Sequence, residues 1–393
     1  MKPSVRIAAA LLAGTAITAA NAWSAQAADP IGIGFVMPYS GWFQPVDATT
    51  INGAMLAVKE LNQGGGVLGR QLEVLAFDNK SEPALGADGT VEVIERGARM
   101  ILFPSDFDFG APGAFIAQQQ GVIAMSGASD PKFGVQGIGP YAYSMSTAAQ
   151  AQGALLAEWA HDTQGWRKPY VLLDNTISFT RSLCSGFTDR WKELAGEAAL
   201  LGEDTFLNSD PSIAAQASRI AGLSDAPDFL LLCSYPPGGP SAIRQLRGAG
   251  IDQPILGGEP LDGDFWAGTV PNLSNFYATG YGSFLGDDPD PEVNGFFRRY
   301  EAEYGQRADS SYPLRGYSII QAWARAVEKA GSLEADAVAA VLDAFTDEPL
   351  VIGPTTYTSQ RHIQTTRPMT IIQVQNGVFS AVGSFAAKTV RLD

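Results

Sequence analysis

Short apolar strands alternate with amphipathic helical segments along almost the whole chain, and this alternation restricts the fold more than any other feature. In the first half, strands are expected at 31–38, 72–78, 100–103 and 122–126, and helices at 50–61, 84–96 and 111–120. The helical segments have apolar residues at the spacing of one helix face, whereas the strands are short continuous apolar runs. This order predicts a parallel sheet that is covered by helices on both faces.

The same order begins again after residue 145 and predicts a second sheet. The expected elements are 153–162, 170–173, 181–195, 199–206, 213–222, 229–232, 241–249 and 255–257, then a strand or crossover at 277–281 and helices near 291–304, 312–330 and 334–345. The tail predicts a β-hairpin of 369–374 and 378–382 around the turn Asn376-Gly377. Because the chain is longer than one core of ordinary size, we expect an α/β protein with two lobes.

The first 27 residues have the parts of a signal peptide. Lys2 and Arg6 give a positive start, and an uncharged stretch rich in Ala, Leu and Ile runs from residue 7 to about residue 22. Ala25-Gln26-Ala27 then supplies the small-x-small pattern that signal peptidase cuts. A buried N-terminal helix is the alternative interpretation. Because no lipobox cysteine precedes the cut, we expect a protein that is free in the periplasm and begins near Ala28.

The composition is globular and acidic. Hydrophobic residues make up 46% and charged residues 17% of the chain, which is typical of a folded protein. The formal net charge is −15, and it becomes more negative when Lys2 and Arg6 leave with the signal peptide. Such a chain repels phosphate backbones and anionic lipid surfaces, so we expect no nucleic-acid partner. After the N-terminal segment, no apolar run is long enough to cross a bilayer.

The chain has two cysteines, Cys184 and Cys233. They lack C-x-x-C spacing and have no histidine nearby, so a zinc site is not expected. Cys184 lies near the start of a predicted helix that follows a strand, and Cys233 ends another predicted strand, so both can lie at one edge of the sheet. Since cysteines of exported proteins often pair, a structural disulfide is the favoured interpretation. Two buried thiols are the alternative.

The chain lacks the residues that catalysis usually requires. Its two histidines are His161, at the end of a predicted helix, and His362, in a polar stretch, and both are expected on the surface. No nucleophile elbow, H-E-x-x-H motif or serine–lysine signature occurs. Gly64-Gly65-Gly66 joins a helix to a strand without a following Lys-Ser/Thr, so it predicts a turn with positive φ. We therefore expect no catalytic residue, cofactor or metal.

Two clusters of carboxylates are present. Asp106 and Asp108 come just beyond a strand, at the edge where open α/β sheets bind ligands, and they are candidates for a site. Asp287, Asp288 and Asp290 are expected in a solvated loop. A pair of carboxylates can hydrolyse a glycoside, but nothing else in the chain supports that chemistry.

Aromatic and small polar residues follow predicted strands in both halves of the chain. Where two sheets face each other at the ends of their strands, such residues enclose a cleft. A cleft lined by aromatic side chains with a few directed polar groups suits the capture of a small molecule. The residues at these positions are Trp42, Phe43, Phe107, Phe109, the segment 126–129, Phe179, Tyr235 and Glu259.

A series of short motifs extends in order over nearly the whole chain after the signal peptide. They are Met37-Pro38-Tyr39-Ser40-Gly41, Asn52-Gly53-Ala54, the segment 62–69 with Asp78 beyond, Ser126-Gly127-Ala128-Ser129-Asp130-Pro131, Leu256-Gly257-Gly258-Glu259, the segment 317–332 and Val351-Ile352-Gly353-Pro354. Each motif is weak, but the ordered set resembles the type I periplasmic binding proteins. It is most similar to the branched-chain amino acid (Leu/Ile/Val) binding proteins of ABC importers.

The resemblance implies two Rossmann-like lobes joined by three crossover segments, with the chain passing between lobes near Met145, Tyr281 and Thr358. The implied division is 1–27 for the signal peptide, 28–145 and 282–357 for lobe 1, and 146–281 and 358–393 for lobe 2. The implied function is that of a monomeric periplasmic receptor, which closes its lobes on a small amino acid with a branched-chain or other apolar or aromatic side chain. It would deliver this solute to the membrane permease of an ABC transporter.

The resemblance also implies the ligand contacts. The α-carboxylate of the ligand would be held by hydroxyl and N–H groups of lobe 1, at positions that correspond to Phe107 or Asp108 and to Ala128 and Ser129. The ammonium group would be held by an acid of lobe 2, which corresponds to Glu259. Aromatic residues that line or cover the pocket correspond to Trp42, Phe179 and Tyr235.

The chain departs from the family pattern at one position. The family usually has a serine where this chain has Phe107 or Asp108. A carboxylate there repels the carboxylate of a ligand unless it bonds another group or points away. An aromatic carboxylate, an amine or an amide-type solute on the same fold is therefore the alternative. A secreted hydrolase is a more distant alternative, because no nucleophile or base is evident.

Overall fold

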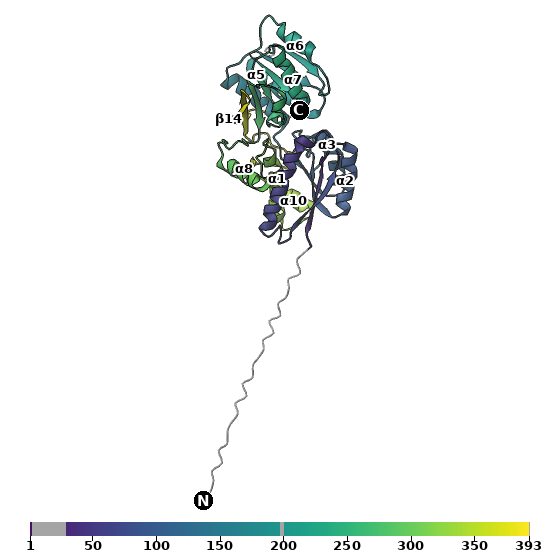
Figure 1. Ribbon diagram of the computed structural model, residues 1–393. Helices are drawn as coiled ribbons and strands as arrows, with labels where there is room; N and C mark the ends of the chain where they lie inside the picture. The colour runs from purple at the N-terminus through teal and green to yellow at the C-terminus, as the bar shows by residue number, and fades with distance from the viewer. Residues whose placement is uncertain (2–28, 197–199, 393) are drawn as a thin grey trace.

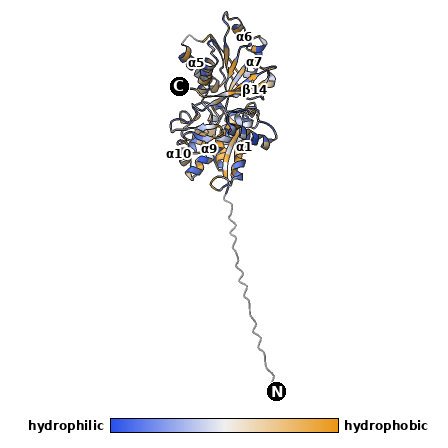
Figure 2. Cartoon of the chain, turned by 90° about the vertical axis from the view of Figure 1, so that its left-hand side faces the viewer, coloured by the Kyte–Doolittle hydropathy of each residue, from blue (hydrophilic) through white to orange (hydrophobic). Residues whose placement is uncertain are grey.

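The computed structural model describes residues 29–196 and 200–392 together with Met1, so the predicted signal peptide lies outside the described residues except for Met1. Two lobes, each built around its own sheet, lie one above the other in Figure 1. The most apolar segments are the strands inside each lobe, and the outer faces of the helices are more hydrophilic (Figure 2). The predicted α/β fold with two parallel-sheet lobes is confirmed.

The first lobe contains a five-stranded, wholly parallel sheet in the order β2-β1-β3-β4-β5. Its strands are β1 (Ile31–Met37), β2 (Leu72–Asp78), β3 (Ala98–Phe103), β4 (Ile123–Ser126) and β5 (Ala142–Ser144). Its helices are α1 (Gln44–Gln63), α2 (Pro83–Glu95), α3 (Phe107–Gln119), α8 (Pro291–Tyr304), α9 (Tyr312–Ala330) and α10 (Ala335–Leu342). Because helices cover both faces, β1, β3 and β4 are buried almost throughout.

The second lobe contains a seven-stranded sheet in the order β14-β13-β10-β9-β8-β6-β7. Its strands are β6 (Pro169–Asp174), β7 (Gly202–Phe206), β8 (Phe229–Cys233), β9 (Ile255–Gly257), β10 (Phe276–Gly280), β13 (Met369–Gln375) and β14 (Val378–Phe385). Its helices are α4 (Ala149–Glu158), continued by a π-helical turn (Trp159–Thr163), α5 (Ser178–Ala195), α6 (Ala214–Ala221) and α7 (Gly238–Gly248). Strand β13 is antiparallel to β10 and forms the predicted hairpin with β14, whose turn residues Asn376 and Gly377 have positive φ.

Short elements complete the two lobes. These are the 3₁₀ turns Glu259–Leu261 and Ala267–Thr269, and the small ribbon of β11 (Glu348–Leu350) and β12 (Gly353–Thr355). Gly65 and Gly66 have φ of 104° and 85°, so the triple glycine forms the predicted turn. Within the part of the chain that the structure describes, no helix is long and apolar enough to cross a membrane.

Helix starts differ most from the sequence predictions. Helix α1 begins at Gln44, before the expected start at residue 50, with Pro45 in its first turn. Helix α3 begins at Phe107 rather than at residue 111, because Asp106 caps it by accepting a hydrogen bond from the N–H of Asp108 at 2.9 Å. Phe107 and Asp108 therefore lie in the first turn of a helix and not in a loop. The three-residue strand β5 was not predicted.

Helices α1 and α9 cross at close range through two glycines. A Cβ on Gly53 would lie 2.1 Å from the carbonyl oxygen of Pro313, and a Cβ on Gly316 would lie 1.9 Å from that of Thr50. Only glycine permits this approach, since any other residue would force the helices apart. The contact brings Arg315 on α9 against the first half of α1.

Three segments pass between the sheets side by side. The N–H of Ser144 donates to the carbonyl of His362 at 2.8 Å, and the N–H of Ala148 donates to that of Gln364 at 2.8 Å. The third segment joins them where the hydroxyl of Tyr281 bonds that of Ser146 at 2.8 Å. The polypeptide link between the lobes is thus a single cluster of adjacent segments.

His362 is buried, so the prediction of a surface histidine was wrong. Its ring stacks on Tyr143 with centroids 4.0 Å apart, and its Nδ1 bonds the carbonyl of Ala142 at 2.7 Å. Its Nε2 lies 2.9 Å from a carboxylate oxygen of Asp343. These partners are remote in sequence. The polar residues next to His362 in the chain therefore gave no indication of its burial. His161 is partly exposed, beside Asp162 at 2.8 Å.

Asp288 is also buried, so the prediction of a wholly solvated acidic loop was wrong at this residue. Its carboxylate accepts hydrogen bonds from the N–H groups of Ser283 at 2.6 Å and Asp290 at 2.8 Å. Asp287 and Asp290 are exposed, as expected, and Asp290 caps helix α8. The backbone of this loop is thus held by hydrogen bonds to the carboxylate of Asp288.

Candidate functional site

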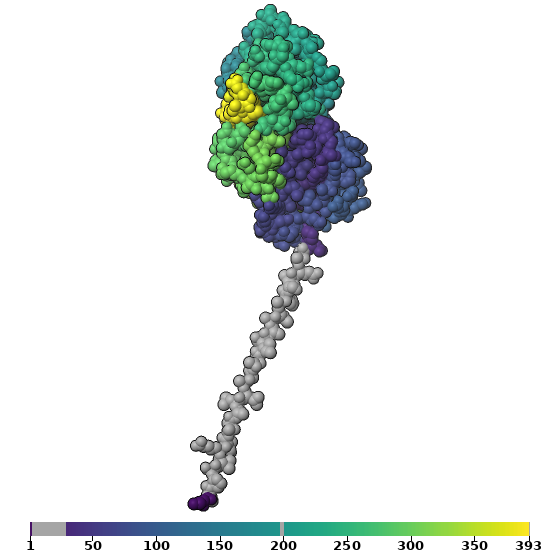
Figure 3. Space-filling view, viewed as in Figure 1, coloured from purple at the N-terminus to yellow at the C-terminus, as the bar shows by residue number. Residues whose placement is uncertain are grey.

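The two lobes face each other across a cleft that is closed in the structure. In Figure 3 the purple residues around α1 meet the teal residues of the second lobe. A cavity of about 20 Å³, roughly the room for one water molecule, lies between them. From the first lobe it is lined by Phe43, Val46, Ser105, Asp106, Tyr312 and Arg315, and from the second by Ile177, Phe179, Tyr235, Glu259 and Pro260.

Arg315 is the central polar residue of this cavity and is only 1% exposed. Its Nη1 lies 3.4 Å from Oε1 of Glu259 and donates to the carbonyl of Gly127 at 3.3 Å. Its Nη2 donates to the hydroxyl of Thr50 at 3.1 Å. The guanidinium also lies over the ring of Tyr312, 4.6 Å from its centroid. A buried cation of the first lobe thus reaches the second lobe directly.

Glu259 follows β9 and is buried at the same place. Its Oε1 accepts from Arg315 and, at 3.3 Å, from the hydroxyl of Ser129. Its N–H donates to the side chain of Gln152, and its carbonyl accepts from the hydroxyl of Tyr312 at 3.0 Å. The residue that the resemblance assigns to a ligand ammonium group is therefore paired with an arginine of the opposite lobe.

Asp47 provides a second carboxylate beside Arg315 and is fully buried. Its Oδ1 is 3.9 Å from Nη2 of Arg315, and its Oδ2 accepts from the N–H of Ser105 at 3.1 Å. Burial raises the pKa of both Asp47 and Glu259, and the charge of Arg315 opposes this rise. Burial also lowers the pKa of Arg315, but Glu259 and other neighbours outweigh it, so the pKa lies above its usual value and the guanidinium stays charged.

Asp106 lines the cavity at the N-terminus of α3 and is 5% exposed. Burial, with the nearby charge of Asp108 as a second cause, raises the pKa of Asp106 to about 8. Its carboxyl group is therefore mostly protonated at neutral pH. A protonated carboxyl can donate a hydrogen bond into the cavity.

Replacing Asp106 by asparagine is expected to stabilise the protein increasingly as the pH is raised from 5 to 8. The folded protein keeps a proton on Asp106 up to about pH 8, whereas the unfolded chain releases it near pH 4. The contribution of Asp106 to wild-type stability therefore falls across this window, and asparagine removes this titration while keeping the helix cap. Thermal unfolding at several pH values measures the difference.

The matched control for this prediction is Asp290→Asn. Asp290 also caps a helix, by accepting from the N–H of Glu292 at 2.8 Å, but it is exposed. Parallel melting curves of wild type and the Asp106 variant across the pH range would show the prediction to be wrong.

Asp108 bonds the opposite lobe instead of facing the cavity. Its Oδ2 accepts from the N–H of Ser178, the first residue of α5, at 3.0 Å. Lys132 donates to the hydroxyl of Ser178 at 3.1 Å and lies over the ring of Phe107, 4.9 Å from its centroid. Because a helix N-terminus attracts a carboxylate, Asp108 serves as a contact between the lobes.

The remaining predicted site residues are divided between the cavity and its surroundings. Phe179 and Tyr235 line the cavity, and Ser129 reaches it through its bond to Glu259. The N–H of Ala128 already donates to the hydroxyl of Ser126 at 2.9 Å. Phe107 and Asp108 are not among the residues that line the cavity.

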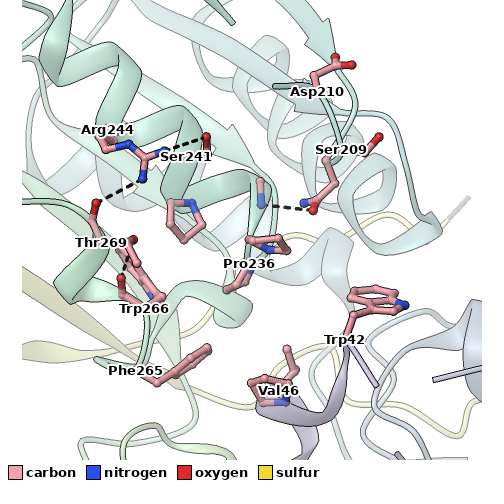
Figure 4. A pocket seen from close by; sticks show the side chains of 15 residues that line it. Trp42, Val46, Ser209, Asp210, Pro236, Ser241, Arg244, Phe265, Trp266 and Thr269 are labelled. Carbon is pink, nitrogen blue, oxygen red and sulfur yellow. Dashed lines mark hydrogen bonds between the residues drawn. The ribbon is translucent and has the colours of Figure 1, made fainter. Parts of the chain in front are cut away.

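Trp42 lies at the rim of the cleft and is 49% exposed. Its ring is 6.2 Å from that of Tyr235 and 5.3 Å from that of Phe109. A wider pocket of about 590 Å³ opens beside it, between the start of α1 and the second lobe (Figure 4). Pro236, Ser241, Arg244, Phe265, Trp266 and Thr269 are among its other lining residues.

Cys184 on α5 and Cys233 at the end of β8 form a disulfide with Cα atoms 5.8 Å apart. The bond joins helix α5, which carries Phe179, to strand β8, which is followed by Tyr235. The structure therefore agrees with the predicted disulfide and not with the alternative of two buried thiols.

Sequence reasoning missed Arg315, Asp47, Thr50 and Tyr312. All four lie on helices rather than after strands, so the search at strand ends passed over them. A signal was available, because Arg315 lies next to a glycine on the same helical face as several apolar residues, near the start of the predicted helix. A charged residue on the buried face of a helix indicates a paired partner.

Two parallel-sheet lobes, linked by adjacent crossover segments and closed over a buried polar cluster, define the bilobal class of binding proteins. A family model described as "Periplasmic binding protein" matches residues 30–378, so the chain belongs to this family. The Leu/Ile/Val-binding protein BraC3 of Rhizobium johnstonii is 24% identical over 347 residues, which cover 87% of this chain and 91% of that protein.

Two solved structures show the same fold. One is the branched-chain amino acid transporter substrate binding protein LivJ of Streptococcus pneumoniae in complex with isoleucine, with a TM-score of 0.80 and 22% identity over 91% of this chain and 99% of that one. The other is a solute binding protein of an ABC transporter from R. palustris in complex with benzoate, with a TM-score of 0.77 and 18% identity over 92% of this chain and 98% of that one.

Proposed function

We propose that this protein is the solute-binding receptor of an ABC importer. The residues 1–27 would direct export and be cleaved near Ala27, leaving a monomer in the periplasm that delivers its solute to a membrane permease. The observation that carries the proposal is the buried polar cluster shared by the two lobes, in which Arg315 meets Glu259. A cluster of this kind lets a solute stabilise the closed arrangement through contacts from both sides.

The proposed motion is a rotation of two lobes about the three crossover segments. One lobe consists of residues 28–145 and 282–357, and the other of residues 146–281 and 358–393. The cavity of about 20 Å³ at Arg315 is too small for an organic solute, so binding at Arg315 requires the lobes to separate and close again. The protein binds its solute without changing it, and it has no catalytic role.

The solute is a small organic molecule with an apolar body. An amino acid with a branched-chain or other apolar or aromatic side chain is the first candidate, because BraC3 and LivJ are named for such ligands. An aromatic carboxylate is the second. It is favoured by the fixed cation at Arg315 and by the likeness to a benzoate complex. Phe43, Phe179 and Tyr235 line the cavity and suit either body.

A ligand screen on the mature protein tests the proposal. Thermal unfolding is measured with the proteinogenic amino acids and with a panel of aromatic and aliphatic carboxylates. At a concentration of about 100 times Kd, a true solute should add about 2.7 kcal/mol to the stability of the folded state. X-ray scattering should show a more compact particle with that solute present. Conversion of a bound compound into a product, or scattering that no stabilising compound changes, contradicts the proposal.

A further inference from the structure

Arg315 has hydrogen-bonding capacity that the protein itself does not use. Among the described residues its Nε has no hydrogen-bond partner, although the atom is buried. Its contact with Glu259, at 3.4 Å, is long for a charge-assisted bond, which usually measures about 2.7–2.9 Å. The guanidinium therefore lines the cavity without the two-pronged carboxylate pairing that arginine forms best.

The surroundings of Arg315 accommodate an anion. The hydroxyl of Ser105 lines the cavity on the same lobe, and Asp106 beside it is mostly protonated at neutral pH. Both groups can donate a hydrogen bond to an oxygen of the solute. Apart from Glu259, the other lining residues from both lobes are aromatic or aliphatic, which leaves the polar end of the solute to this part of the cavity.

A ligand ammonium group fits the same place poorly. At Oε1 of Glu259 it would be next to the guanidinium of Arg315. Two like charges about 4 Å apart near a protein surface repel by about 4 kcal/mol, and the pair here is more deeply buried. Glu259 is thus already occupied by the cation that an amino acid would have to replace.

We propose that the cleft selects carboxylic acids that lack an α-ammonium group. In the bound state the carboxylate of the solute takes the place of the Glu259 carboxylate at Arg315, and Glu259 takes up one proton. One anion replaces another at the guanidinium, so the charge of the buried cluster is unchanged. This inference rests on the proposed function, because it names the solute class of the same cleft.

The groups around Glu259 favour its neutral form once Arg315 is taken by the solute. Burial is the main cause of the raised pKa of Glu259, and Arg315 is the main opposing charge. Without that opposition, the nearby carboxylates favour protonation further. The titratable and charged groups that face Glu259 are Arg315 and Tyr312 on α9, Asp47 on α1, Tyr281 on a crossover segment and Asp262 in its own 3₁₀ turn region.

Calorimetric titration with matched compounds tests the inference. One series shares the carbon skeleton of leucine: leucine, 4-methylpentanoate and 3-methylbutylamine. The other comprises phenylalanine, 3-phenylpropanoate and phenethylamine. At pH 7 one carboxylate should bind at least tenfold more tightly than its amino acid, and the amines should bind least. Titration in phosphate and in Tris should show uptake of about one proton.

An amino acid that binds as tightly as its carboxylate overturns the inference while leaving the receptor function intact. Absence of binding in both series also overturns it. The receptor function itself fails if no amino acid or carboxylate of the screening panel stabilises the protein, if no stabilising compound changes the scattering, or if a bound compound is converted into a product.

Two variants locate the effect. Arg315→Lys keeps the charge but loses the planar fork, so the best carboxylate should bind at least tenfold more weakly. Glu259→Gln should abolish the proton uptake. This variant tests the inference even if Arg315→Lys does not fold. If Glu259 holds a ligand ammonium group instead, Glu259→Gln weakens the binding of leucine. In that case the wild-type protein takes up no proton on binding. Arg219→Lys, at an exposed arginine paired with Asp204, is the control.

Discussion

Replacing Arg315 by leucine is expected to lower the free energy of unfolding by about 3–5 kcal/mol at pH 8. The substitution leaves the buried carboxylates of Asp47 and Glu259 without their cation. Burial already raises the pKa of both acids, so at pH 5 they take up protons and the loss should be smaller. Urea unfolding of wild type and variant at the two pH values measures both numbers.

Two further variants separate charge from packing. Arg315→Leu/Glu259→Gln removes one of the two stranded acids and should recover part of the loss. Arg219→Leu, at an arginine that is half exposed, should cost less than about 1 kcal/mol. If Arg315→Leu loses the same free energy at pH 5 and pH 8, the lost contact with the ring of Tyr312 matters more than the charge.

The fold was predictable from the sequence because it depends on local periodicity. Strand β2 and helices α8 and α9 have the predicted bounds, and both helices combine a clear apolar spacing with a proline in the first turn and a glycine after the last residue. Helix α9 was thus placed correctly along the chain. Its first turn was nevertheless not recognised as part of a site.

The site depends on contacts that no local pattern contains. Thr50 and Arg315 are 265 positions apart in the sequence, and they meet because Gly53 and Gly316 let two helices cross at close range. The burial of His362 has the same origin, since its partners Tyr143 and Asp343 come from two segments of the first lobe that are remote in the sequence from His362. Residues after strands were easier to predict, because the fold rule itself places them at the cleft.

Glu259 shows how far a resemblance extends. The motif around it predicted a buried acid of the second lobe in the cleft, and that is where the residue lies. The motif does not reveal that this chain has an arginine opposite it. The fold determines the position of Glu259 in the cleft, but the role of this carboxylate depends on its neighbour Arg315. The binding of a ligand ammonium group by Glu259 therefore stays a prediction, which the calorimetric titrations can refute.

Removing the disulfide with the double variant Cys184→Ala/Cys233→Ala is expected to lower the free energy of unfolding by about 4 kcal/mol. The two cysteines are separated by 49 positions, and chain-entropy reasoning gives about this value for a loop of that length. The bond also fixes α5 against β8, which carry Phe179 and lead to Tyr235. Urea unfolding of the mature variant without reductant gives the loss.

The single variant Cys184→Ala decides whether the crosslink or the packing is responsible. It also breaks the disulfide but keeps the second sulfur, which is fully buried in β8. If restriction of the unfolded chain is the main effect, the single and double variants should lose nearly the same free energy. A double variant that is much less stable than the single one shows instead that the sulfur atom of Cys233 stabilises the core, because a cavity penalty would then add to the lost crosslink.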